Sequence, residues 1–397
     1  MPEDNSTLGD VRVLDLSEHI AGPFCTKLLA GLGAEVIKVE RPGVGDASRK
    51  SGPFLHDEPH PETSASFLYL NTGKKSITLD LESEVGRSIL LRLIRECDIL
   101  VESFPPGHLD KRDLGYASVR SHNPKMVFTS ISPFGQAGLY KDYKGSDIVA
   151  QAMGGLMHPI GLPERGPLKI GGNPALYTTG MSAFSGTMVA LHVRDIEGYG
   201  QHVDISAMET MAVTQIHSSI NYQFQGADTG RRKSNLVRAK DGWANPDVHI
   251  GIRESTWDRF FELLGKPELS NDPRFATSEA RGENEETLNS IIKDWVADQS
   301  KEDVYHQLQG LSTVAGYVAT VEDLLNSGQF VSRRFFQSID HPFAGEAMYP
   351  GAPFSIDGDV WHHSRAPLLG EHNVEVYCGL LGHTREDLAQ MEGQGVI

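Results

Sequence analysis

A chain of 397 residues, of which 39% are hydrophobic, is long enough for two domains of an ordinary soluble protein. Its formal net charge of -17 argues against nucleic acid or an anionic membrane as the main partner, although a local basic pocket is compatible with it. Cys25, Cys97 and Cys378 are too widely spaced to predict a disulfide framework or a zinc site. The acidic N-terminus does not resemble a signal peptide, and no apolar run reaches the roughly 18 residues that span a bilayer. We therefore expect a soluble, cytoplasmic protein.

The first 40 residues predict a βαβ unit. Residues 11–16 read as a short apolar strand, residues 24–33 as an amphipathic helix that ends at a glycine, and residues 34–39 as a second strand. This order is typical of a Rossmann-like α/β domain with a parallel sheet. The first turn lacks GxGxxG, so a dinucleotide site is not expected. The turn at residues 21–23 does place a helix N-terminus at the carboxyl end of a strand, where anions bind.

The alternation of strands and helices continues along the chain. Further strands are expected at residues 76–81, 98–104 and 125–131, and further helices at residues 84–97, 114–123, 145–156, 178–194 and 203–224, with a tight turn before a strand at 198–202.

Composition suggests where the domains meet. The polar and basic residues 225–240 predict a linker, and residues 241–325 a smaller α/β domain with a hairpin-like strand pair at 241–252 and helices at 255–265 and 288–299. The tail from residue 326 is rich in Pro and Gly and is expected to pack back on the first domain. The predicted large domain therefore joins residues 1–224 with residues 326–397.

Polar residues follow several of the predicted strands. They are Glu18-His19, Glu40-Arg41 and Glu102-Ser103-Phe104, and Lys74-Lys75, Lys111 and Lys144 add cations. Because open α/β sheets bind ligands at the carboxyl ends of their strands, these residues indicate a site for the phosphates of a nucleotide-like cofactor. Taken singly, each lysine or arginine is more often a solvated surface residue. Their clustering on one predicted edge is what favours the pocket.

Asp147 and the histidines are the remaining candidate site residues. Asp147 opens a predicted helix, and either it caps that helix together with Ser146 or it has a role in the site. The histidines at 158, 192, 202, 217 and 249 have no companions at metal-ligand spacing, so no metal is expected. The residues alone therefore indicate an α/β protein with an anion pocket.

Eight segments, in their order and spacing, allow a closer identification. They are residues 13–46 (VLDLSEHIAGPFCTKLLAGLGAEVIKVERPGVGD), 71–83 (NTGKKSITLDLES), 98–116 (DILVESFPPGHLDKRDLGY), 130–140 (SISPFGQAGLY), 145–156 (GSDIVAQAMGGL), 198–206 (GYGQHVDIS), 241–250 (DGWANPDVHI) and 365–376 (RAPLLGEHNVEV). Together they resemble the class III CoA-transferases, the family of formyl-CoA transferase and carnitine CoA-transferase. The resemblance runs from about residue 10 to the end of the chain.

The resemblance implies a large Rossmann-like domain and a smaller one, with two chains threaded through each other as interlocked rings. It also implies that coenzyme A binds as thioester at the carboxyl edge of the sheet, with no metal. By similarity the CoA contacts are Ile20, Ala21, Arg41, Leu79 to Glu82, Ser103, Phe104, Pro105, Lys111 and Lys144 to Asp147.

The family's nucleophile is absent from its expected position. In the family an aspartate attacks the acyl-CoA thioester, forms a mixed anhydride and releases CoA thiolate; the acceptor acid then displaces the acyl group, and CoA returns to form the new thioester. That aspartate lies four residues before a glycine. Residues 167–181 align with its segment without a gap, so the glycine is Gly180, in the stretch GGNPALYTTG, and the aspartate's position is Leu176. An alkyl side chain cannot attack a thioester.

Three other departures concern the same apparatus. Ile20 stands where the family keeps a glutamine, and residues 226–240 do not read as the family's glycine-rich loop. Ser146 stands where the racemases of the superfamily keep a histidine, so an α-methylacyl-CoA racemase is not expected.

Three functional interpretations follow. The favoured one is the non-nucleophilic subunit of a heteromeric CoA-transferase, similar to succinyl-CoA:benzylsuccinate CoA-transferase, whose homologous partner carries the aspartate. The second is a homodimeric CoA-thioester lyase or hydratase that uses Asp147 or Glu18 as its base. The third is a CoA-binding regulatory protein without turnover.

Overall fold

Six parallel strands form the central sheet of this computed structural model, which describes all residues except 1–5, 228–229, 232–234, 247–252 and 357–360. The strand order is β3-β2-β1-β4-β5-β6. The strands are β1 (Arg12–Asp15), β2 (Glu35–Glu40), β3 (Lys75–Thr78), β4 (Ile99–Glu102), β5 (Val127–Ser132) and β6 (His202–Ser206). The order reverses between β1 and β4, which is the place where open α/β sheets form a ligand crevice. The predicted α/β class with a parallel sheet is confirmed.

Alternate residues of each strand enter two different cores. Leu14, Ile37 and Leu100 belong to one buried cluster, whereas their neighbours Val13 and Val36 belong to another. Since successive side chains of a strand point to opposite faces, the sheet is covered on both sides. This explains why its strands read as continuous apolar runs.

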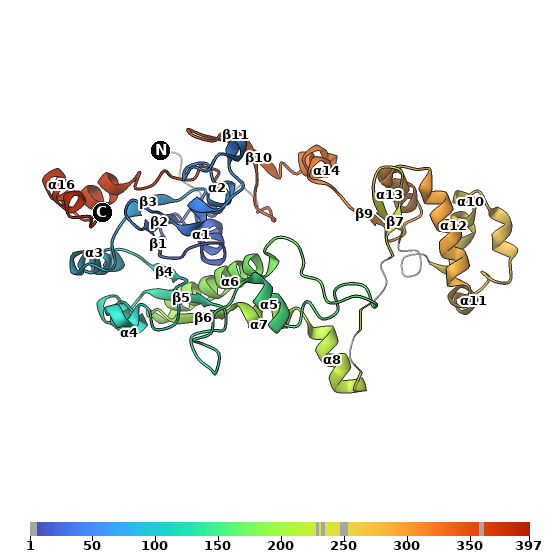
Figure 1. Cartoon of the computed structure of the whole chain (residues 1–397), viewed down its shortest axis with the longest axis horizontal. Helices are drawn as coiled ribbons and strands as arrows, with labels where there is room; N and C mark the ends of the chain where they lie inside the picture. Colours follow the sequence, from blue (N-terminus) through green and yellow to red (C-terminus); the bar gives the residue numbers. More distant parts are fainter. Residues whose placement is uncertain (1–5, 228–229, 232–234, 247–252, 357–360) are drawn as a thin grey trace. The chain divides into compact units, whose positions relative to one another are not determined.

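Helices supply the two covering layers (Figure 1). One face carries α1 (Ala21–Gly31) and the 24-residue α6 (Pro174–Glu197). The other carries α3 (Glu84–Arg95), α4 (Tyr116–His122) and the chain's C-terminal segment. The remaining helices before residue 226 are α2 (Ala65–Leu70), α5 (Asp147–Met153), α7 (Ala207–Val213) and α8 (Ile216–Gln225).

The expected helix at 203–224 is wrong in its first residues. Residues 202–206 form β6, which pairs in parallel with β5 from Phe128↔His202 to Ser132↔Ser206. Helix begins only at Ala207, where the Ser206 hydroxyl accepts the backbone N–H of Glu209 as an N-cap. The alternation of His, Val, Asp and Ile suits a strand, and pairing with β5 decides between the two patterns.

Contacts divide the chain into two units, Met1–Arg231 with Arg334–Ile397, and Arg232–Arg333. Within the second unit, β7 (Val237–Arg238), β8 (Trp243–Asn245) and β9 (Gly316–Tyr317) form an antiparallel sheet. Its helices are α10 (Trp257–Leu263), α11 (Ser278–Glu283), α12 (Glu285–Ala297), α13 (Lys301–Gly310), α14 (Val321–Asn326) and α15 (Gly328–Ser332). The proposed linker 225–240 ends inside this unit, because Val237 and Ala239 are buried in its core. Part of that linker and the second half of the expected hairpin at 241–252 lie outside the described residues.

The C-terminal segment completes the first unit. It contains the antiparallel pair β10 (Phe336–His341) and β11 (Gly345–Pro350), a π-helical segment (Glu375–Leu380) and α16 (Arg385–Gly393). The Tyr377 hydroxyl donates to the carbonyl of Thr78 at 2.6 Å, and the backbone N–H of Asp80 donates to the carbonyl of Val396 at 2.8 Å. The end of the chain therefore holds the end of strand β3.

Candidate active site

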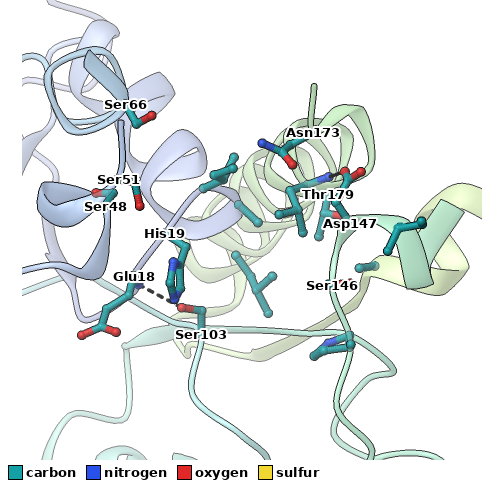
Figure 2. Close-up of a pocket in the computed structure, with 18 of the residues that line it drawn as sticks. Glu18, His19, Ser48, Ser51, Ser66, Ser103, Ser146, Asp147, Asn173 and Thr179 are labelled. Carbon is teal, nitrogen blue, oxygen red and sulfur yellow. Dashed lines mark hydrogen bonds between the residues drawn. The ribbon is translucent and has the colours of Figure 1, made fainter. Parts of the chain in front are cut away.

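A cavity of about 750 Å³ opens where β1, β4 and β5 end (Figure 2). Its lining comes from the β1–α1 loop, the loops after β4 and β5, and the starts of α5 and α6. The described lining residues are Glu18, His19, Ile20, Ala21, Ser48, Ser51, Gly52, Ser66, Ser103, Ile131, Ser132, Pro133, Gly145, Ser146, Asp147, Ile148, Lys169, Asn173, Leu176, Thr179 and Ala207.

A buried charge network fixes the β1–α1 loop in the cavity wall. Asp15, the last residue of β1, lies 3.0 Å from the Lys74 amine, and Lys38 lies 2.7 Å from Asp46. Burial by itself would raise the pKa of Asp15, but Lys38 and Lys74 lower it well below its usual range. Lys38 also donates to the carbonyl of Ser17 at 2.8 Å. The loop is thus anchored by charges that are satisfied inside the protein.

A second cavity, of about 490 Å³, lies against the first. It is lined by Leu16, Glu18, His19, Val39, Glu40, Arg41, Leu79, Asp80, Leu81, Glu82, Ser103, Phe104, Pro105 and His108. Glu18, His19 and Ser103 line both cavities. A ligand that extends from one cavity into the other therefore passes these three side chains.

The residues predicted to bind CoA fall into three groups. The second cavity gathers Arg41, Leu79, Glu82, Ser103, Phe104 and Pro105, and the first gathers Ile20, Ala21, Ser103 and Asp147. Lys111 and Lys144 are exposed and line neither cavity. The structure brings most of the set together but leaves these two lysines outside the cavity walls.

Arg41 is already paired in this structure. Its guanidinium donates to both carboxylate oxygens of Glu18, at 2.9 and 3.1 Å. The Arg41 side chain is 64% exposed, so the pair is strongly screened and exchanges easily for a phosphate. Glu18 therefore holds the arginine near the mouth of the second cavity.

His19 is a candidate residue that the implied CoA contacts did not include. It follows β1 directly, lines both cavities, and has a φ of 68°. This left-handed conformation is unfavourable for a side chain other than glycine. Its backbone N–H donates to Asp46 at 3.3 Å, and Figure 2 shows its ring beside Ser103 and Glu18. The sequence indicates Glu18 and His19 as polar residues at the end of a strand. The strained backbone of His19 cannot be predicted from the sequence, because no local pattern indicates a positive φ at this residue.

Asp147 caps a helix, although a different one from the helix it opens. Its Oδ1 accepts the backbone N–H groups of Ala175 at 3.0 Å and Leu176 at 3.4 Å, at the start of α6. Its Oδ2 accepts from Gln151 Nε2 at 2.6 Å and lies 3.1 Å from Lys169 Nζ. Ser146, the N-cap residue of α5, makes no side-chain capping bond. Asp147 is thus nearly buried and held by four donors.

Leu176 lies in the first turn of α6 and contributes to the cavity wall. One turn later, Gly180 allows α6 to approach α1 closely, because a Cβ at this position would lie 2.5 Å from the carbonyl oxygen of Ala21. This contact brings position 176 next to the β1–α1 loop. Leu176 is half-buried and packs against the core beneath α1 and α6.

Metal-binding clusters and membrane-spanning helices are both absent from the described residues. No group of three or more His, Cys, Asp or Glu side chains within the described ranges is placed to hold a metal ion. None of the helices in the described part of the chain has the length and hydropathy of a membrane-spanning segment.

Comparison with known proteins gives the chain a family. The model of CoA-transferase family III matches residues 8–373. The chain is 34% identical to a succinyl-CoA–D-citramalate CoA-transferase of Chloroflexus aurantiacus, covering 98% of both chains. It is also 34% identical to a formyl-CoA:oxalate CoA-transferase of Streptomyces avermitilis, covering 98% of this chain and 99% of the relative.

A third relative and a solved structure agree. A succinyl-CoA:mesaconate CoA-transferase of Haloarcula hispanica is 32% identical, covering 93% of this chain and 95% of the relative. The crystal structure of a CaiB/BaiF family protein from Brucella suis matches with a TM-score of 0.84 and 32% identity, covering 95% of this chain and all of that one. The protein belongs to CoA-transferase family III.

Proposed function

We propose that this chain is the non-nucleophilic subunit of a CoA-transferase that moves CoA from an acyl-CoA to a carboxylic acid. Its partner is a homologous chain that carries the nucleophilic aspartate. The observation that carries the proposal is Leu176, an alkyl side chain in the cavity wall at the position where the family resemblance expects the aspartate. Of the two carboxylates in the lining of the larger cavity, Asp147 is already held by four donors.

The two cavities suggest how CoA binds to this chain. The nucleotide occupies the smaller of these two cavities, where Arg41 exchanges Glu18 for a phosphate and the exposed side chains of Lys111 and Lys144 add positive charge. The pantetheine arm then passes His19 and Ser103 into the larger cavity. This path uses the residues that line both cavities, and it leaves the thioester facing Leu176.

Chemistry is proposed to occur on the partner. There the aspartate attacks the thioester carbon, the C–S bond breaks, and CoA leaves as the thiolate. The acceptor carboxylate takes the acyl group from the aspartyl anhydride and frees the aspartate. The returning CoA thiolate then attacks the carbonyl carbon of the acceptor, which forms the new thioester, breaks the anhydride C–O bond and releases the donor acid as its carboxylate. No proton is gained or lost in the sum, so the reaction needs no additional cofactor. This chain contributes to the formation of the dimer, whereas the covalent steps take place on the partner.

The path of the chain supports an interlocked dimer. Residues 1–231 and 334–397 belong to one unit, and the second unit is inserted between them. The chain therefore closes on itself, which is the requirement for two chains to be threaded as rings. In such a dimer a chain with a silent site remains indispensable.

Two of the similar enzymes are named for succinyl-CoA, which supports succinyl-CoA as the acyl donor.

The three cysteines are free thiols, which fits the reducing cytoplasm that we propose as the location.

The contacts of Asp147 count against a homodimeric lyase or hydratase that uses this residue as its base. A general base needs an oxygen that reaches a substrate proton, and in this structure four donors hold Asp147. A CoA-binding regulatory protein is compatible with both cavities. It differs from the proposal in having no turnover with any partner.

Native mass spectrometry of the protein co-expressed with its neighbouring genes tests the proposal. We expect one copy of this 43.5 kDa chain bound to a second chain of similar size. Succinyl-CoA and candidate acids are then supplied to the complex. We expect turnover that is lost when the partner's aspartate is replaced by alanine and kept in Leu176→Ala.

Two results would contradict the proposal. A homodimer of this chain alone that transfers CoA would show that its own site is active. A complex that keeps its turnover when the partner's aspartate is replaced by alanine would place chemistry at this chain's cavity.

A further inference from the structure

A buried carboxylate lies behind the proposed CoA cavity and has no role so far. Glu102 is the last residue of β4, is 4% exposed, and forms no ion pair with any described residue. It lies at a third cavity, of about 240 Å³, lined by Glu102, Pro105, Pro106, Gly107, His108, Leu109, Asp110, Gly115, Tyr116, Phe128, Ser130, Gln136, Lys141 and His202. Burial raises the pKa of Glu102 to about 7.

On one side, Glu102 holds the segment that lines the CoA cavity. Its Oε2 accepts the backbone N–H of Phe104 at 2.7 Å. The Phe104 ring stacks on His108 with centroids 4.5 Å apart and planes 8° apart. Both rings line the cavity that contains Arg41. The position of this pair of rings therefore depends on the hydrogen bond to Glu102.

On its other side, Glu102 faces mainly neutral and acidic groups. The Ser130 hydroxyl bonds to it and lies 2.9 Å from His202 Nε2, and His202 stacks on Tyr116. Burial lowers the pKa of His202, so its ring is neutral near pH 7. The other charged or titratable groups that face Glu102 are Asp110, Asp204, His108 and Lys141. Asp110 and Asp204 favour the neutral acid, since like charges repel.

We propose that Glu102 is a positioning residue for CoA: its carboxylate holds Phe104 and His108 in the CoA-binding arrangement, and protonation of Glu102 releases them. This inference rests on the proposed CoA site. An ionised acceptor binds a backbone N–H more strongly than a neutral acid does. CoA affinity therefore falls as the pH drops through about 7.

The direction of this effect separates Glu102 from the histidines. His108 lines the same cavity, and a histidine that gains a proton adds positive charge beside the anionic CoA. Histidine titration would thus strengthen binding in acid, the opposite of the proposed effect. The phosphates of CoA also titrate in this range, but their contribution to the pH dependence of binding is the same for every protein variant.

The test is calorimetric titration of the full-length protein with free CoA at pH 6, 7 and 8. For the wild type we expect the Kd to rise about tenfold from pH 8 to pH 6, because the ionised fraction of a group with a pKa of about 7 falls by that factor. The isosteric Glu102→Gln is expected to bind at pH 8 about as weakly as the wild type does at pH 6. Relative to the wild type, its Kd should lose the tenfold rise between pH 8 and pH 6.

Asp110→Asn serves as the matched variant. It removes a charge that faces Glu102, so we expect full affinity at pH 8 and a midpoint shifted to lower pH. A wild-type affinity that stays level or rises in acid, or a Glu102→Gln variant that keeps the full pH dependence, overturns the role of Glu102. Absence of CoA binding at every pH instead overturns the proposed CoA site.

Discussion

The backbone nitrogen of Leu176 lies 3.4 Å from Oδ1 of Asp147, so the helix start that presents position 176 is already occupied by a carboxylate. A second carboxylate at position 176 would share this helix start with Asp147. Repulsion between like charges raises the pKa of the new group, which lowers the fraction that is ionised and able to attack a thioester.

We therefore expect that Leu176→Asp does not restore CoA transfer by this chain. Ile20 stands in the place of the family's glutamine and has no polar group, so the variant would still lack that side chain's hydrogen bonds. The measurement is chromatographic detection of the new CoA thioester, with Leu176→Asn as the uncharged control of equal size. Turnover in the Asp variant but not in the Asn variant would mean that this one position had silenced the site.

Asp147→Asn tests whether Asp147 is a helix cap rather than a base. We expect the free energy of unfolding to fall by about 1–2 kcal/mol, because the charge that faces the N-terminus of α6 and Lys169 is lost. Urea denaturation measures the change. Ser146→Ala, at a residue that makes no capping bond, should leave stability unchanged. Unaltered stability combined with lost CoA binding would show that Asp147 acts on the ligand instead.

His19 offers a comparison of two truncations. Both His19→Gly and His19→Ala remove the ring from the CoA path, but only glycine relieves the φ of 68°. We expect the glycine variant to be the more stable by about 1 kcal/mol, and both variants to lose CoA affinity to the same degree. Thermal denaturation and calorimetry supply the two measurements. Wild-type affinity in both variants would remove His19 from the proposed binding path.

Glu102→Gln should make the protein more stable in mild alkali. The pKa of Glu102 is about 7 in the folded protein and near 4.5 in the unfolded chain. The stability that the neutral acid contributes is complete below pH 4.5 and is lost as the pH rises through 7. At pH 8 we expect the variant to exceed the wild type by on the order of 2 kcal/mol, with the difference much smaller at pH 5 and gone below pH 4.5.

Urea denaturation at pH 5 and pH 8 measures this difference. Glu82→Gln is the control, because Glu82 lies on the surface, where a charge costs little. A Glu102→Gln variant that is less stable than the wild type at pH 8 would show that the buried charge is stabilising. Taken with the CoA titration, the expected result means that stability is sacrificed at Glu102 for ligand binding.

The sequence was sufficient for features that repeat along the chain. Alternating apolar strands and helices predicted the parallel sheet, and polar residues after the strands predicted the edge where Arg41, Ser103 and Phe104 now line one cavity. The predicted helix at 203–224 wrongly includes most of strand β6, because the periodicity of five residues is too weak to distinguish a strand from a helix. Their pairing with β5 is a tertiary contact that no local pattern records.

Single-residue features of the site could not be predicted in this way. The capping of α6 by Asp147 joins residues 28 and 29 positions apart. The strain at His19 and the isolation of Glu102 depend on what surrounds them in three dimensions. Composition shows that such residues exist, but burial and partners decide what they do.

The bonds from Tyr377 to Thr78 and from Asp80 to Val396 also set an order of events during synthesis. Tyr377 is made 299 residues after Thr78, so strand β3 leaves the ribosome long before the residues that secure its end. The inserted unit, residues 232–333, is already fully made when Tyr377 and Val396 emerge. The first unit can close at this edge only after that point.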